Sequence, residues 1–177
     1  MMMKNEGTFA AKVVDHDLEV DSQMNLKQVM VRFDVIDTDG STKQITWYGS
    51  FKPLQPGKQT SATEITLKTL AILGFKGTKP VDLMALSRVQ PGTDELKPLA
   101  LDGEKLVDLV LANDTYNGKT TLKVKFINEQ GRGAMKRMDV AAPGMINFGG
   151  LDIESNLAEI ASKRGTTTAA PTVKAPF

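Results

Sequence analysis

Residues 104–128 constrain the fold of this chain more than any other stretch. They read EKLVDLVLANDTYNGKTTLKVKFIN, in which two runs rich in apolar and β-branched residues flank an Asn-Gly pair. Asn-Gly between such runs is a strong hairpin signal, because the tight turn needs positive φ at both central residues. Lys123 and Lys125 alternate with apolar residues in the second run, so we expect both lysines on one side of the strand. The chain therefore contains a β-hairpin with a basic side.

Three further strands are expected before this hairpin. Residues 8–14 predict a short first strand, and the acidic, polar residues 15–26 predict a surface loop. Residues 27–36 alternate strictly, which indicates a half-buried strand with its apolar residues in the core: Val29, Val31, Phe33 and Val35. A turn at 37–40 leads to a third strand over 43–51.

Two or three helices are also expected. Ser61 and Glu64 have the spacing of a capping box, which predicts a largely buried helix over 62–73 that ends at Gly74. A short second helix is expected at 81–87 and a loop at 88–100. The amphipathic pattern of 151–164 predicts a C-terminal helix, and the low-complexity residues 165–177 predict a disordered tail.

Three strands, a helix and a hairpin, in this order, are the connectivity of an OB-fold. We therefore expect a mainly β protein, a five-stranded OB-fold barrel with the helix between strands 3 and 4. The expected division is a barrel domain at 1–130, a C-terminal extension at 131–164 and a flexible tail at 165–177. An SH3-like barrel and a small sandwich are the alternatives.

Composition argues against an enzyme. The chain has no cysteine, which excludes disulfides, thiolate zinc sites and cysteine nucleophiles. His16 is the single histidine, and its acidic neighbours Asp15 and Asp17 favour a solvated loop position over a catalytic or metal-binding one. No phosphate-binding loop motif is present, and we interpret the glycines at 131–133 and 149–150 as linkers. We expect no cofactor, no metal and no catalysis.

The location expected from the sequence is the cytoplasm. No apolar run is long enough for a membrane span, and the first residues, MMMKNEG, lack the apolar centre of a signal peptide. The formal net charge is only +1. Any attraction to a polyanion must therefore come from local clusters of basic residues rather than from the charge of the whole molecule.

One such cluster follows Gly118. Only Glu129 interrupts it before Asp139, and it comprises Lys119, Lys123, Lys125, Arg132, Lys136 and Arg137. Arg32 points outward from the second strand. A row of outward cations is often only a solvated sheet face. In an OB-fold, however, strands 2 and 3 and the first and last hairpin loops line a groove for oligonucleotides.

Aromatic residues on the same elements supply candidate stacking platforms. Trp47 shares a face with Ile45 and Phe51, whereas Tyr48 lies on the other face of the third strand. Either Trp47 is in the core and Tyr48 faces outward, or the sheet is inverted and Trp47 is the platform. The candidate nucleic-acid-binding residues are Arg32, Trp47, Tyr48, Tyr116, Lys119, Lys123 and Lys125.

Four segments together resemble bacteriophage-type single-stranded DNA-binding proteins of the small OB-fold kind. They are GTFAAKVV (7–14), ITWYGSF (45–51), LAILGFKG (70–77) and the hairpin from Tyr116 to Asn128, so the resemblance covers about residues 7–130. It implies binding of single-stranded DNA without sequence specificity, protecting transient strands during phage DNA replication or recombination in the bacterial cytoplasm.

The C-terminal sequence is relevant to the binding of partner proteins. Many proteins of this functional class end in an acidic, disordered tail whose terminal aromatic residue recruits replication or recombination proteins. Phe177 matches the aromatic residue, but residues 165–177 contain no acid. Two rivals remain open: a phage structural or assembly β-barrel protein without affinity for nucleic acid, and an RNA-binding or protein-recruiting OB module.

Overall fold

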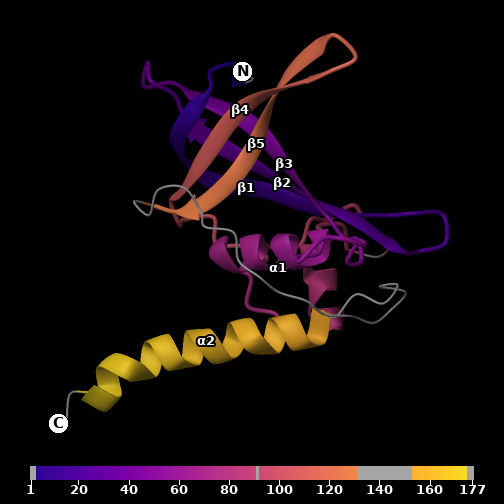
Figure 1. Ribbon diagram of the computed structural model, residues 1–177, viewed down its shortest axis with the longest axis vertical. Helices are drawn as coiled ribbons and strands as arrows, with labels where there is room; N and C mark the ends of the chain where they lie inside the picture. Colours follow the sequence, from indigo (N-terminus) through magenta and orange to yellow (C-terminus); the bar gives the residue numbers. More distant parts are fainter. Residues whose placement is uncertain (1–2, 91, 131–152, 175–177) are drawn as a thin grey trace.

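The computed structural model describes residues 3–90, 92–130 and 153–174, with the side chains of the last helix described as far as Arg164 (Figure 1). The elements in chain order are β1 (Gly7–Val20), β2 (Leu26–Ile36), β3 (Thr42–Ser50), α1 (Ala62–Ile72), the 3-10 helix η1 (Pro80–Leu86), β4 (Val107–Tyr116), β5 (Lys119–Glu129) and α2 (Ile153–Lys174).

The strands form one antiparallel sheet of five strands in the order β3-β2-β1-β4-β5, so the predicted mainly β class is confirmed. The alternating residues of β2 face the core as predicted, and Val31 and Phe33 pair with Trp47 and Ile45 of β3. The edge strands β3 and β5 approach each other without a hydrogen-bonded ladder between the described strands. The sheet is therefore open, and closure into a barrel stays a prediction.

Helix α1 lies between the sheet and α2 (Figure 1). It begins as predicted, because Ser61 Oγ accepts a hydrogen bond from the backbone N–H of Glu64 at 3.1 Å. It ends at Ile72, and Gly74 just beyond it provides the predicted stop, because its φ of 90° lets the N–H groups of Gly74 and Phe75 reach the carbonyls of Ala71 and Leu70. Leu67 and Leu70 are fully buried beneath the sheet.

The expected surface loop at 15–26 is wrong over its first part, because β1 continues to Val20 and only residues 21–25 connect it to β2. Asp15, Asp17 and Glu19 alternate with His16 and Leu18, and this period of two keeps the acidic side chains off the core side of the strand. Charge alone suggested a loop, but the alternation is that of a strand with one polar face.

His16 is consequently buried, not a solvated loop residue as expected. Its Nδ1 lies 2.8 Å from the carbonyl oxygen of Leu86, and its Nε2 accepts a hydrogen bond of 2.8 Å from the backbone N–H of Ala100. Because Nε2 is an acceptor, the proton is on Nδ1 and the ring is neutral. Burial is the main cause that lowers the pKa of His16. Through these two contacts the imidazole ring connects β1 to η1 and to the loop that follows η1.

Helix α2 begins near the predicted position but extends to Lys174 instead of ending at 164. Ile153 and Leu157 are buried in the common core, which fixes its first turns against α1. Once a helix is nucleated, each further residue adds one hydrogen bond, so weak helix formers can continue it. The predicted tail is thus helical as far as Lys174, and Phe177 lies outside the described residues. None of the described helices is long and apolar enough to cross a membrane.

Candidate nucleic-acid interface

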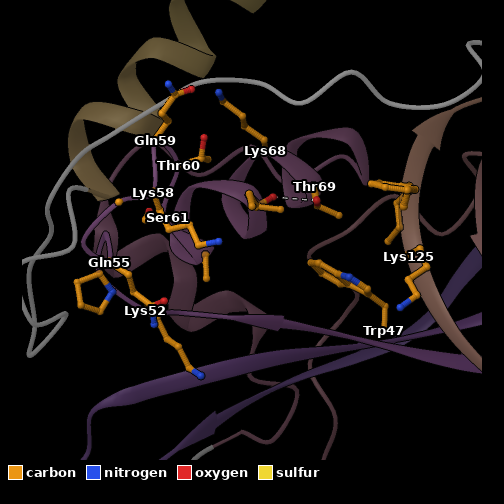
Figure 2. Close-up of a pocket in the computed structure, with 16 residues that line it drawn as sticks. Trp47, Lys52, Gln55, Lys58, Gln59, Thr60, Ser61, Lys68, Thr69 and Lys125 are labelled. Atoms are coloured by element: carbon orange, nitrogen blue, oxygen red, sulfur yellow. Dashed lines mark hydrogen bonds between the residues drawn. The ribbon is translucent and has the colours of Figure 1, made fainter. Parts of the chain in front are cut away.

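A groove of about 720 Å³ lies where the N-terminal half of α1 meets the loop 52–60 and the edge strands β3 and β5 (Figure 2). The loop forms because Pro53 and Pro56 cannot continue a ladder and Gly57 adopts a φ of 77°. Trp47 and Lys125 lie at one end of the view, and Lys52 and Lys58 lie at the other. The groove thus brings the edges of the open sheet and the start of α1 together.

Cations dominate the charge of this groove. The described residues that line it include no aspartate or glutamate and four lysines: Lys52, Lys58, Lys68 and Lys125. Lys52 and Lys58 are exposed and form no ion pair with any described residue. Sequence reasoning did not single out these two lysines, although residues 40–63 contain Lys43, Lys52 and Lys58 and no acidic residue. This stretch without acidic residues was the feature of the sequence that could have identified them.

Lys68 differs from the other lysines of the groove because a buried carboxylate partly balances its charge. Its side chain is 9% exposed, and its Nζ lies 3.2 Å from Oε1 of the fully buried Glu64. Its charge also contributes, after the hydrogen bond from Lys163, to the lowered pKa of Glu159 on α2. Lys52 and Lys58 therefore supply most of the uncompensated positive potential, whereas Lys125 is partly balanced by Asp114.

Apolar and aromatic side chains form the remainder of the lining. Trp47 is half-buried against the core and still reaches the groove, together with the exposed Phe126 and Ile65. Tyr48 lies on the opposite face of β3 and is 56% exposed. The two candidate platforms therefore belong to different surfaces, and only Trp47 faces this groove.

Arg32 also lies away from the groove. In the ladder between β2 and β3 it pairs with Thr46, next to the Met30 and Tyr48 pair, so Arg32 and Tyr48 share the outer face of the sheet. On the β1 side Arg32 lies opposite Asp15. This face carries acidic residues beside its cation, unlike the groove.

The hairpin of β4 and β5 has the predicted tight turn, with Asn117 at a φ of 49° and Gly118 at 74°. Tyr116 and Lys119 flank the turn and are exposed, Tyr116 at 76%. The hairpin projects beyond the rest of the sheet (Figure 1). Its tip is therefore accessible on both sides.

The lysines that were predicted to form a row on β5 lie close to an acidic side chain. Asp114, on the neighbouring strand, accepts a hydrogen bond from Lys123 and lies 3.8 Å from Lys125. Both lysines lower the pKa of Asp114, the hydrogen bond from Lys123 most of all. Counting charges along the chain missed this acid because it lies across the hairpin. A register shift between Val110 and Leu111 leaves Lys125 without a cross-strand partner, so Lys125 both approaches Asp114 and lines the groove.

Several residues singled out from the sequence fall outside the described ranges. They are Arg132, Lys136, Arg137, the glycines at 131–133 and 149–150, and Phe177. Within the part of the chain that the structure describes, no group of three or more His, Cys, Asp or Glu side chains could hold a metal ion.

Comparison with protein families and with curated proteins finds no relative. No protein-family model matches the chain, and no curated protein is significantly similar to it. The chemistry of the groove must therefore be judged from its own residues. A concave surface with uncompensated lysines and a half-buried indole suits a ligand that carries both negative charges and flat apolar groups.

Proposed function

We propose that the protein binds single-stranded DNA in this groove, with little sequence preference and without catalysis. The observation that carries the proposal is that four lysines share one groove with Trp47, with no acidic residue among the described side chains that line it. Phosphates would lie against Lys52, Lys58 and Lys125, and a base would stack on Trp47. The resemblance of residues 7–130 to phage single-stranded DNA-binding proteins supports a role in phage DNA replication or recombination.

We also propose that the sheet is an OB-fold whose closure between β3 and β5 is incomplete. Support comes from the strand order, in which β1 pairs with both β2 and β4, and from the position of α1 between β3 and β4 in the chain. The groove lies at the gap between the two edge strands. An open seam of this kind leaves the Trp47 side chain accessible.

The β4–β5 hairpin extends the proposed path of the strand. Lys125 lies at the groove, and Lys123, Lys119 and Tyr116 follow it toward the projecting tip. A single strand is flexible enough to contact both the groove and the hairpin, whereas a duplex keeps its bases paired and stacked inside. We therefore expect single strands to bind more tightly than duplex DNA of the same length.

The test is fluorescence anisotropy of a labelled poly-dT oligonucleotide, titrated with the protein at several salt concentrations. We expect binding whose log K falls with log salt at a slope of roughly −2 to −3.5, since three to five phosphate contacts each add about −0.7. Duplex DNA should compete poorly. RNA of the same sequence and an acidic peptide serve as further competitors. Absence of binding at low salt, together with ordered oligomers, would instead favour a structural or assembly protein.

Removing the acid beside the lysine row should strengthen binding. In Asp114→Asn, Lys123 and Lys125 lose the carboxylate that both approach and become available to phosphates. We expect severalfold tighter binding of poly-dT and a steeper salt dependence, as one more phosphate contact predicts. Asp94→Asn, on the loop after η1 and outside the groove, is the matched control. Equal affinity of the two variants would show that the hairpin lysines do not contact DNA.

A further inference from the structure

Gly49 lies two residues beyond Trp47 on the same face of β3, and the space beside it is occupied. A Cβ atom at position 49 would lie 2.5 Å from Cη2 of Trp47 and 2.7 Å from Cγ2 of Thr66 on α1. The backbone conformation at Gly49 is an ordinary extended one, so conformation does not require glycine at this position. The requirement is space, because the indole extends along β3 over a residue that has no side chain.

The surroundings of this contact restrict the indole at one edge. Gly49 is buried beneath α1, and Thr66 Oγ1 donates a hydrogen bond of 2.8 Å to the carbonyl oxygen of Ser50. This bond fixes α1 against the end of β3. Val31 pairs with Trp47 from β2 and is fully buried. The edge of the indole is thereby enclosed, while the side chain still lines the groove.

We infer that Gly49 is a positioning residue that presents Trp47 as a rigid stacking platform for one unpaired nucleobase. The inference rests on the proposed function and names the residue that positions the base-binding side chain of this stacking subsite. A platform that is fixed before binding loses little side-chain freedom when a base stacks on it. A paired base keeps its faces covered by its neighbours, so the subsite selects unpaired nucleotides by exposed base surface rather than by sequence.

The experiment compares two ligands that share a sugar-phosphate backbone: poly-dT and an abasic oligonucleotide of equal length. The natural protein should bind poly-dT roughly 5- to 100-fold more tightly, the range that one stacked base gives. Trp47 is the single tryptophan, so its fluorescence reports on the subsite directly. It should be quenched by poly-dT and not by the abasic strand.

The deciding variant is Gly49→Ala combined with Thr66→Ser. Serine removes Cγ2 and keeps the hydroxyl that bonds to Ser50, and the oxygen of this hydroxyl lies 3.0 Å from the added Cβ. Cη2 of Trp47, at 2.5 Å, then makes the closest contact and is the group with most need to move. We expect the affinity for poly-dT to fall to that for the abasic strand, whose own affinity stays unchanged. Thr66→Ser alone is the control and should keep the preference. Thermal unfolding of both variants checks that the fold persists.

The possible results separate the subsite from the proposed function. If neither ligand binds the natural protein, the proposed function fails. If the natural protein binds both ligands equally well, DNA binding stands and the stacking subsite is refuted. If the double variant keeps the full preference for poly-dT, Trp47 does not depend on Gly49 and the positioning role is refuted.

Discussion

Replacing Lys52, Lys58 and Lys125 together by glutamine should weaken binding of poly-dT by on the order of 100-fold at 0.1 M salt. Each phosphate contact to a single strand contributes a factor of about 5 at this concentration, as follows from a slope of about −0.7 per contact. The slope of log K against log salt should become shallower by about 2. Lys52 and Lys58 form no ion pair with any described residue, and Lys125 lies 3.8 Å from Asp114, so the effect should exceed that of removing the same charge outside the groove.

The matched control removes the same charge elsewhere. Lys4, Lys76 and Lys79 are exposed and lie outside the groove. Their replacement by glutamine changes the net charge of the protein equally, so it measures the loss of general attraction. Fluorescence anisotropy over a salt series reads both variants. If the two triple variants lose the same affinity, the groove is not the binding site, and the outer face with Arg32 and Tyr48 becomes the next candidate.

The strands were predictable because local chemistry and tertiary packing agree in them. The alternation of β2, the Asn-Gly turn of the hairpin and the Ser61 cap each specify one local structure, and each occurs as predicted. β1 was predicted too short because local chemistry and tertiary packing disagree in its second half. Its second half carries acidic residues on its polar face, and only pairing with β2 shows that this half is a strand.

The candidate site was less predictable because it is assembled from distant segments. Lys125 was found from its strand pattern, whereas Lys52 and Lys58 lie in a loop where no periodicity marks them. Asp114 changes the meaning of the lysine row through a contact across the hairpin. The orientation of Trp47 could not be chosen from alternation, because both faces of β3 carry one aromatic residue. Packing of α1 against β3 decides which of them lines the groove.

His16 shows the same dependence on tertiary contacts, and it predicts how stability varies with pH. The pKa of its ring is lowered mainly by burial; the carbonyl of Leu86 raises it, and the charge of Arg88 lowers it further, against opposing contributions from Asp15 and Asp17. Below about pH 6.5 the unfolded chain therefore binds a proton that the folded protein does not. We expect the free energy of unfolding to be constant just above this pH and to fall as the pH drops toward 5, by at most about 1.4 kcal/mol per pH unit.

Among the described residues, the carboxyl groups with a resolved shift titrate below this interval. The shifted carboxyl groups all have pKa values below their ordinary ones, and Lys43, Thr38 and Asn5 lower that of Asp37 to about 2. A depressed carboxyl pKa removes stability only once the pH falls below the ordinary value near 4. His16 is the single histidine of the chain, so a variant at this position shows whether a change between pH 5 and 6.5 belongs to it.

Urea unfolding followed by Trp47 fluorescence at steps of pH measures this dependence, and His16→Asn supplies the decisive comparison. Asparagine retains a donor for the Leu86 carbonyl and leaves the N–H of Ala100 without its acceptor. We expect a loss of about 1–3 kcal/mol at pH 7 and no slope between pH 5 and 6.5. A natural protein equally stable at both ends of this interval, or a variant that keeps the slope, would show that the buried ring is not the titrating group.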